Sequence, residues 1–502
     1  MKQTSVTFHT TNETLQRMTA AAEEVCRGNI MDYDGRTVLV EGGGYRSMWP
    51  ETSPMAGDMY AKRNMEIALT NQTIFLDYQR PDGRLPGMLH VNTTADVENQ
   101  PDDIPVEPTG VAVNYGWLQG CCYPQHALNL YYYADLDKTY LERLYDAFSR
   151  YDEYLWRWRD SDGDGCLEVW CEWDTGEDNA ARMRGMYHAW GSERPPEPGH
   201  GFAPMESMDV MAYSYVTRDV LAQISALLQN GRETEWREKA QQVAQKVRDY
   251  LWIEEKDACY DRDQNNAFID ILVHNNLRLM YYGVFSQEMA DRFVKRHLKN
   301  PEEFWTNMPL PSVAANDPAF SGVQGNSWAG HPQGLTYQRS VLALERYGYV
   351  AELTHLFRKL SAAIGPACCF SQAYDTHTME PCGTGDRDYG PTTLAFLELL
   401  ARTHGVSVCA KEMIWGAAEE EEDWSYTQQW GDETYTLEKK GGEARALCDG
   451  RLLFTFPAGF RVVTDRNCKP LFAARIEETP KEFCWNGCEL GTLSANETIS
   501  LS

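Results

Sequence analysis

Apolar residues recur at helical spacing over most of the chain between residues 120 and 405. In three segments they stand three and four residues apart, and turn-forming residues interrupt each segment near its middle. The segments and their interruptions are 122–160 at Asp135–Asp137, 205–252 at Asn230–Gly231, and 334–365 at Tyr347–Gly348. This pattern predicts pairs of helices joined by short turns. One further helical stretch is expected near 57–79, among short segments separated by turn signals.

Beyond Gly405 the pattern changes from helical spacing to alternation. Stretches such as ETYTLEKK at 433–440 and LLFTFPAGFRVVTD at 452–465 alternate apolar and polar residues between turns, which is typical of antiparallel strands with one buried face. The acidic run EEEED at 419–423 is expected to be a solvated connector. The sequence therefore predicts a small antiparallel β-domain after the helical region.

The helical pairs carry no readable repeat motif, so they fit a closed toroid of helical hairpins better than a solenoid. We therefore expect a mainly α protein, an (α/α)6 toroid, with two domains. Residues 1–405 are expected to form the toroid with an N-terminal extension, and residues 406–502 a β-domain of the sandwich type. Long loops at the inner helix ends are where we expect the chemistry.

The chain has 74 acidic and 46 basic residues among 502, a formal net charge of −28. This charge repels nucleic acid backbones and anionic membranes, so neither is an expected partner. The absence of a membrane-length apolar run and of a signal-peptide core in the sequence indicates a cytoplasmic location. The 14 cysteines lack zinc-site spacing and are expected to be mostly buried thiols. The sequence leaves open whether the chain forms a homo-oligomer.

The stretch CLEVWCEWDTGEDNAARMRG at 166–185 combines tryptophans, carboxylates and two arginines. Cleavage of a glycosidic bond needs one carboxylic acid that stays protonated beside the leaving oxygen, and a second carboxylate that activates water or attacks. Asp178 has the acidic and aromatic sequence neighbours that raise a carboxyl pKa. The structural alternative is that these acids cap a helix beginning near Asn179.

Further motifs accompany this stretch along the chain. In order, they are YQRPDGRLPG at 78–87, WLQGCCYPQHA at 117–127, WRWRDSDGDGCLEVWCEWDTGEDNAAR at 156–182, FWTNMPLPSVAANDPAF at 304–320 and NSWAGHPQGLTYQ at 326–338. Together they resemble the motifs of (α/α)6-barrel glycoside hydrolases of family 63 and of mannosylglycerate-hydrolase-like enzymes, with family 37 trehalases more distant. The resemblance covers about residues 40 to 405.

The resemblance implies an inverting glycoside hydrolase that acts on a short α-linked glucoside or mannoside and needs no cofactor. Its expected partner is an oligosaccharide or glycoside substrate. In the family motif ExGxDNSPR the aspartate is the general acid, and here that residue is Asp178. The residues that match are Gly176, Glu177, Asp178, Asn179 and Arg182, while Asp174 stands where glutamate is commoner.

The second carboxylate is missing from its expected place. Relatives carry the base in a motif F-x-E-x-Y. The segment CCFSQAYDTHTMEPCGTG at 368–385 matches it at Phe370 and Tyr374 but has Gln372 at the glutamate position. A neutral amide cannot act as a general base. Three explanations stay open: Gln372 replaces a catalytic glutamate, the base is Asp375 or Glu380, or the site binds sugar without hydrolysing it.

Several other residues are candidates for substrate contact, because aromatic faces stack on sugar rings and polar side chains bind hydroxyls. They are Tyr45, Arg46, Trp49, Glu51, Trp117, Gln119, Asp174, Glu177, Arg182, Trp328, Gln333 and Tyr374. A structural role is an equally good interpretation of each. In NSWAGHPQG, Ala329 replaces an arginine of the relatives, which removes an expected contact near the base and the sugar.

The run DSDGDG places Asp160, Asp162 and Asp164 at alternate positions before a glycine, as in a calcium loop. Such a loop carries a bidentate acid at its twelfth position, and here that position is Cys171. A glycine-rich turn is therefore the preferred interpretation.

No metal is predicted, because neither His331 nor His377 has a second histidine at ligand spacing. Two other functions stay open. One is a catalytically inactive carbohydrate-binding protein on a glycosidase fold, which Gln372 would explain. The other is a sugar epimerase, which would need a catalytic histidine pair.

Overall fold

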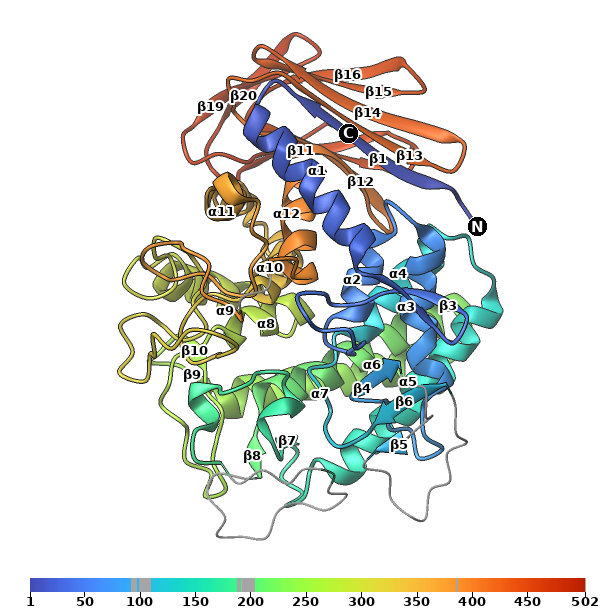
Figure 1. The fold of residues 1–502 in the computed structure, drawn as a ribbon, viewed down its shortest axis with the longest axis vertical. Helices are drawn as coiled ribbons and strands as arrows, with labels where there is room; N and C mark the ends of the chain where they lie inside the picture. The colour runs from blue at the N-terminus through green and yellow to red at the C-terminus, as the bar shows by residue number, and fades with distance from the viewer. Residues whose placement is uncertain (92–96, 99–109, 187–190, 192–203, 385–386, 502) are drawn as a thin grey trace.

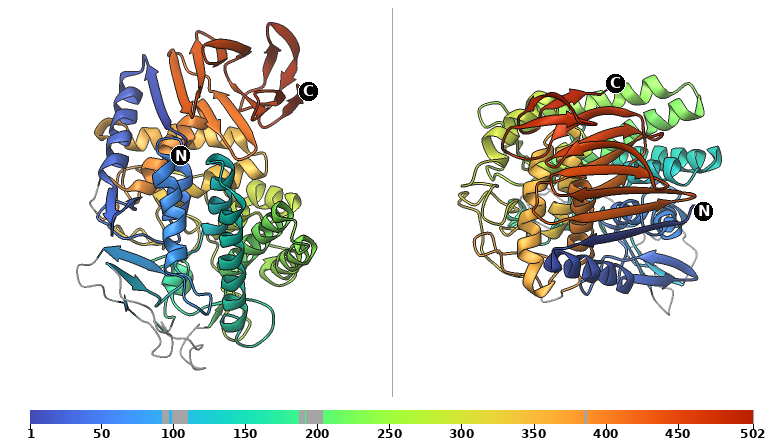
Figure 2. Two further views of the ribbon diagram at one scale, coloured as in Figure 1. Left: turned by 90° about the vertical axis from the view of Figure 1, so that its right-hand side faces the viewer. Right: turned by 90° about the horizontal axis from the view of Figure 1, so that it is seen from above.

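The computed structural model describes residues 1–91, 97–98, 110–186, 191, 204–384 and 387–501. The helices form one region, and two large antiparallel sheets lie beyond one end of it (Figure 1). A side view and a view from above show the same arrangement, with the strands of the sheets stacked over the helix ends (Figure 2).

The helical region confirms the three predicted helix pairs. Its helices are α1 Glu13–Gly28, α2 Ser53–Tyr60, α3 Met65–Asp77, α4 Tyr123–Tyr133, α5 Lys138–Trp158, α6 Met208–Leu228, α7 Glu233–Lys246, α8 Asn275–Tyr282, α9 Gln287–Phe293, α10 Gly334–Arg346, α11 Val350–Ile364 and α12 Gly390–Thr403. The pairs are α4 with α5, α6 with α7, and α10 with α11. Gly231 and Gly348, in two of the turns, have φ of 78° and 81°, which glycine adopts without strain.

The stretch near 57–79 is two helices rather than the single one predicted. α2 ends at Tyr60, and Asn64 begins α3 by accepting a hydrogen bond from the backbone N–H of Ile67. A side-chain oxygen that satisfies a free N–H of the first turn favours a new helix start. Helix α1, which Asn12 caps in the same way through Leu15, is not among the predicted elements.

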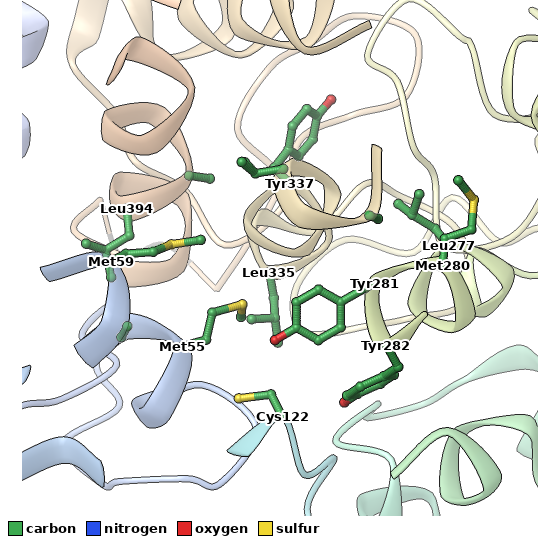
Figure 3. Packing of buried hydrophobic residues seen from close by; sticks show 14 of the residues in the cluster. Met55, Met59, Cys122, Leu277, Met280, Tyr281, Tyr282, Leu335, Tyr337 and Leu394 are labelled. Atoms are coloured by element: carbon green, nitrogen blue, oxygen red, sulfur yellow. The ribbon is translucent and has the colours of Figure 1, made fainter. Parts of the chain in front are cut away.

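Buried side chains from four helices meet in the centre of the helical region (Figure 3). Met55 and Met59 come from α2, Tyr281 from α8, Leu335 from α10 and Leu394 from α12. Burying a side chain of this size contributes about 1.5–3 kcal/mol. This packing holds the starts of α2 and α10 together, and with them the loops that precede both helices.

Short strands flank the helices and fix the loops between them. They are β2 Ile30–Tyr33 with β3 Arg36–Leu39; β4 Met88–Val91 and β5 Val97–Glu98 with β6 Val111–Asn114; β7 Glu168–Val169 with β8 Met205–Glu206; and β9 Trp252–Ile253 with β10 Ala258–Cys259. Strand β7 stands directly before the loop that contains Asp178.

The predicted C-terminal β-region is confirmed as two five-stranded antiparallel sheets and a hairpin. The first sheet has the order β1 Thr4–Thr10, β13 Trp424–Trp430, β14 Glu433–Lys440, β15 Glu443–Cys448 and β16 Arg451–Pro457. The second has the order β11 His404–Val408, β12 Glu412–Ala417, β17 Phe460–Asp465, β18 Pro470–Arg475 and β21 Thr498–Ser500. The hairpin is β19 Lys481–Trp485 with β20 Cys488–Leu493.

The alternation that predicted these strands is the alternation of their burial. Every second residue of β14 from 435 to 439 is buried. Trp415 on β12 contacts the rings of Tyr435 and Phe454 across the interface, with centroids 6.1 and 5.7 Å apart. The two sheets therefore pack face to face. The acidic run joins β12 to β13, as expected of a connector, although Glu419 also pairs with Arg475 and Lys481.

The first sheet contains one strand from the other end of the chain. β1 pairs with β13, so that Thr4 lies opposite Trp430, and α1 then packs against α12. The division at residue 405 stays a prediction, but residues 4–10 belong to the β-layer rather than to the helical region.

All fourteen cysteines are free thiols, and more than half of them are buried. Within the described residues, no helix has both the length and the apolar composition needed to cross a bilayer. The cytoplasmic location and the oligomeric state stay predictions.

Candidate active site

A cavity of about 260 Å³ opens where the loops before α2 and α10 meet the loop that carries Asp178. Its lining combines carboxyl groups, amides and aromatic rings. The lining residues are Glu41, Tyr45, Trp49, Glu51, Met88, Trp117, Gln119, Trp173, Gly176, Asp178, Asn326, Trp328, Leu335, Gln372 and Tyr389. Eight of the fourteen predicted site residues are among them, so the structure brings together segments far apart in the sequence.

Asp178 reaches the cavity because the preceding loop turns sharply at Gly176. This glycine has φ of 72°, and a Cβ there would lie 1.9 Å from Oε2 of Glu51, so only glycine fits. The carbonyl of Asp178 accepts a hydrogen bond from the backbone N–H of Trp328 at 2.9 Å. Its side chain accepts one from Nδ2 of Asn326. The short helix at 181–183 has no side-chain cap. Asp178 is therefore not a helix-capping residue, which was the structural alternative to a role as acid.

Burial raises the pKa of Asp178 above its ordinary value, and hydrogen bonds from Asn326 and Trp173 oppose part of that rise. A carboxyl group in such a setting keeps its proton to a higher pH than a solvated one. Asp178 is therefore suited to donate a proton.

Gln372 binds the side-chain amide of Asn326 at its oxygen, while Asp178 binds its nitrogen. Its Nε2 donates to Oδ1 of Asn326 at 3.0 Å, and its Oε1 accepts from the hydroxyls of Tyr45 and Thr384, each at 3.3 Å. The side chain thus points into the cavity, as the motif comparison predicts for position 372.

Glu51 also lines the cavity, but arginines hold it. Its Oε1 pairs with Arg339 at 2.7 Å and with Arg278 at 3.7 Å, and its Oε2 accepts from Gln119 at 3.2 Å. Burial raises the pKa of Glu51, while these two arginines pull in the opposite direction. Its position is set by these partners.

A buried ion network lies beside the loop that carries Asp178. Arg182 pairs with Glu177, Asp209 and Asp261, and Glu177 also accepts from His274 at 2.8 Å. Burial alone would raise the pKa of Glu177, but Arg278, Arg182 and the His274 hydrogen bond hold it well below its ordinary value. Glu177 and Arg182 therefore orient the loop around Asp178 without lining the cavity.

Four other predicted contacts also lie outside the cavity lining. Arg46 is exposed. Asp174 is buried and binds Arg159 at 2.6 Å and the backbone N–H of Leu118 at 2.8 Å. Gln333 donates to the carbonyl of Ser327, and Tyr374 donates to the carbonyl of Cys369. Together with Glu177 and Arg182, these residues are absent from the cavity lining. Protein partners bind at least one polar atom of each buried one, and the Arg46 side chain is exposed.

The two carboxyl groups considered as relocated bases are also absent from this lining. Asp375 accepts hydrogen bonds from the backbone N–H groups of His377 and Thr378 at 2.9 and 2.8 Å, closing its own turn. Glu380 is exposed.

Seven lining residues are not among the predicted site residues: Glu41, Met88, Trp173, Gly176, Asn326, Leu335 and Tyr389. Glu41 lies directly before the Gly-rich loop, and the backbone N–H of Gly390 donates to its carbonyl at 2.7 Å. Burial raises the pKa of Glu41 to about 8; the Tyr389 hydrogen bond opposes this, and the charges of Glu51 and Asp178 add to it. The only signal in the sequence is that Glu41 lies close to Tyr45.

Two tyrosines connect Glu41 with Gln372. Tyr389 hydrogen-bonds Glu41, its ring contacts that of Tyr45 edge-on at 6.2 Å, and the Tyr45 hydroxyl donates to Gln372. Glu41 and Gln372 are thus connected within the cavity lining, and aromatic rings form much of the rest. Such a site suits a sugar ring with carboxyl groups beside it.

The sequence model of the mannosylglycerate hydrolase MGH1-like glycoside hydrolase domain matches residues 45–392, in agreement with the resemblance of the motifs. A search of curated protein sequences gives no significant match.

Solved structures share the fold. A GH63 mannosylglycerate hydrolase from Thermus thermophilus, in complex with glucose, superposes with a TM-score of 0.61 at 19% identity, over 77% of this chain and 100% of its own. Neutral trehalase from Saccharomyces cerevisiae superposes with a TM-score of 0.54 at 13% identity, over 76% of this chain and 79% of its own. An α-L-rhamnosidase from Dictyoglumus thermophilum superposes with a TM-score of 0.56 at 13% identity, over 89% of this chain and 44% of its own.

Proposed function

The chain belongs to the mannosylglycerate hydrolase MGH1-like glycoside hydrolase family, and from this we propose that it hydrolyses a short α-linked glucoside or mannoside with inversion. The observation that carries the proposal is Asp178, a half-buried carboxyl group of raised pKa beside an aromatic cavity. We also propose that the helical pairs close into an (α/α)6 toroid.

In this mechanism Asp178 protonates the leaving oxygen as the glycosidic bond breaks. A general acid must hold its proton near the working pH, and the burial of Asp178 favours that form. Trp328 and Asn326 fix the backbone and the side chain of Asp178. The donor is thereby oriented before substrate enters.

An inverting reaction also needs an ionised carboxylate that activates water on the opposite face. Gln372 is neutral, and Glu51 is held by two arginines. Glu41 is the remaining carboxyl group of the described lining. We therefore assign the base to Glu41, which Tyr389 and Tyr45 connect to position 372.

Glu41 has the contacts of an oriented base. Thr52 donates to its Oε2 at 3.2 Å, Tyr389 hydrogen-bonds its carboxyl group, and Gly390 fixes its backbone. The proximity of Asp178 means that the two groups influence each other's charge. When Asp178 holds its proton, ionisation of Glu41 becomes easier, and this is the charge state that the mechanism requires.

The cavity is small for a ligand site, so we propose that it takes one sugar ring. A second, polar cavity of about 500 Å³ shares Asn326 with it and includes Arg184 and Gln324. We propose that the group released by Asp178 lies there. A cationic side chain in that cavity makes glycosides of small hydroxy acids suitable test substrates.

The proposal is tested by incubating the protein with α- and β-linked glucosides and mannosides, including α-mannosyl and α-glucosyl glycerate. We expect hydrolysis of an α-linked member, with the β-anomer appearing first by proton NMR. Asp178→Asn should lower that rate about 10²–10⁴-fold. It should retain activity on the corresponding glycosyl fluoride, whose leaving group needs no proton. Wild-type turnover by Asp178→Asn would refute the assignment of the acid.

One observation favours a second function, a carbohydrate-binding protein that does not hydrolyse. By the motif resemblance Gln372 stands at the position of the family's base, and both its amide nitrogen and its amide oxygen are hydrogen-bonded. This interpretation predicts that calorimetry detects binding of a panel member while NMR detects no cleavage over days.

A further inference from the structure

Five carboxyl groups gather at the turn that precedes the Asp178 loop. Asp160, Asp162 and Asp164 form one group, and Asp162, Glu168 and Glu206 form a second; within each group, carboxylate oxygens lie within 4.8 Å of one another. Asp162 belongs to both groups. The cluster is separate from the sugar cavity, whose lining contains none of these residues.

Glu206 joins the cluster through strand pairing. β7 and β8 are antiparallel, and Glu168 lies directly opposite Glu206 in their register. Like charges in opposite positions of a strand pair are unfavourable, so this arrangement requires compensation.

The carboxyl group of Glu206 is not fully satisfied by protein. The residue is 4% exposed, and its Oε2 is buried without a hydrogen-bond partner among the described residues. A buried acceptor left without a partner is costly. Lys246 contacts the cluster only at Asp164, with its Nζ 3.1 Å from Oδ2. Among the described residues, a positive charge is thus lacking where Asp162, Glu168 and Glu206 meet.

We propose that this cluster binds a calcium ion. The donors are carboxylate oxygens, which hard divalent cations prefer, and they come from a turn and a strand that can surround a large ion. Magnesium requires a tighter octahedron, and zinc prefers nitrogen and sulfur donors. The turn also keeps the alternating aspartates and the following Gly165 of a calcium loop.

This site could not be recognised by counting along the chain. Position twelve of the loop is Cys171, and the missing acid is supplied by Glu206 from the neighbouring strand. The strand pairing that brings it there is a property of the fold.

The cation would stabilise the loop that carries Asp178. Oε1 of Glu168 accepts from Ser161 Oγ at 2.5 Å, and its Oε2 accepts from Trp170 Nε1 at 3.1 Å. The backbone N–H of Trp170 donates to Asp174 at 2.8 Å. A bound cation is therefore connected to the Asp178 loop through Glu168, Trp170 and Asp174.

The test uses Tb³⁺ luminescence with the full-length protein, after treatment with a chelator and dialysis. Trp170 hydrogen-bonds a proposed ligand, so its excitation should sensitise Tb³⁺ emission, and Ca²⁺ should displace Tb³⁺ better than equal Mg²⁺. Glu206→Gln and Asp162→Asn should each weaken binding about 10–100-fold. Glu489→Gln, at an exposed acid on β20, is the matched control. Trp170→Phe should reduce emission while Ca²⁺ still raises the Tm.

Asp162 is exposed, so Asp162→Asn should fold even if Glu206→Gln does not. The proposal is overturned if no sensitised emission appears, if Ca²⁺ leaves the Tm unchanged, or if Asp162→Asn binds like the wild type. Stronger displacement by Zn²⁺ than by Ca²⁺ would also overturn it. None of these measurements depends on hydrolytic activity, so failure of the proposed function leaves them interpretable.

Discussion

Asp178 and Gln372 bind opposite ends of one side chain. Asn326 donates through Nδ2 to Asp178 and accepts through Oδ1 from Gln372 at 3.0 Å. A carboxylate at position 372 cannot donate, so the Asn326 amide would have to turn and present Nδ2 to it. Oδ1 of Asn326 would then face Asp178, which favours the protonated form of Asp178. In this chain, with Gln372 in place, the ionised base has to stand elsewhere, and we assign it to Glu41.

This assignment predicts how two substitutions combine. Glu41→Gln should abolish hydrolysis, whereas Gln372→Glu alone should give no gain, because a second negative charge opposes ionisation of Glu41. The double variant should recover about 10²-fold over Glu41→Gln, since a second carboxylate again lines the cavity beside Asp178. Steady-state kinetics on the best panel substrate provides the measurement. A large gain from Gln372→Glu alone would show that the wild type lacks a working base.

The pH dependence of kcat/KM should report Glu41. Its pKa of about 8 means that the ionised fraction of Glu41 increases about tenfold per pH unit below that value, so the rate should rise with pH wherever Asp178 keeps its proton. In the double variant, the hydroxyls of Tyr45 and Thr384 that now bind Gln372 would stabilise the new carboxylate. Its rising limb should therefore move to lower pH. An unchanged profile in the double variant would argue against both assignments.

Glu41 should also make stability depend on pH. Its pKa is raised from 4.5 to about 8 in the folded state, so its stabilising contribution is complete below about pH 4.5 and is lost as the pH rises through about 8. Glu41→Gln should therefore be more stable than the wild type at about pH 8.5, by as much as about 4 kcal/mol, but not at about pH 5.

Urea unfolding at the two pH values measures this difference. Glu489→Gln, at an exposed position, is the control: its free energy of unfolding should differ from that of the wild type by the same amount at both pH values. An equal effect of Glu41→Gln at both pH values would mean that Glu41 is not protonated in the folded protein at neutral pH.

Gly176 should tolerate no side chain. An alanine Cβ would meet Glu51 Oε2 at 1.9 Å, on backbone with φ of 72°, so Gly176→Ala should displace the Asp178 loop and lower kcat. Gly231→Ala is the control, because its φ is 78° with no atom within 4 Å of the added Cβ. The control should cost about 1–2 kcal/mol without changing kcat. Normal kcat in Gly176→Ala would contradict the close packing of Gly176 against Glu51.

The elements that the sequence predicted correctly depend on local patterns. The helix pairs follow apolar spacing and the turns at Gly231 and Gly348, and β14 follows the alternation of ETYTLEKK. β1 was not predicted, because its partner lies at the other end of the chain, with Thr4 opposite Trp430. Its hydrophobic pattern alone does not indicate which sheet it joins.

The same limit applies to predicting the site residues from the sequence. Asp178 lies in a motif readable from neighbouring residues, and so does position 372. Glu41 has no such motif: its environment comes from Tyr389 and Gly390 at the start of α12. Glu206 likewise meets Glu168 only through strand pairing. Residues that act through distant partners require the fold before they can be recognised.

The most direct test of the mechanism is azide rescue of Glu41→Gln. In an inverting enzyme that lacks its base, azide can replace the activated water and attack the same face of the sugar. With an α-linked substrate, we predict that azide restores turnover and that NMR identifies the β-glycosyl azide. Full activity of Glu41→Gln without azide, or formation of the α-glycosyl azide, would contradict the role of Glu41 as the base of an inverting hydrolase.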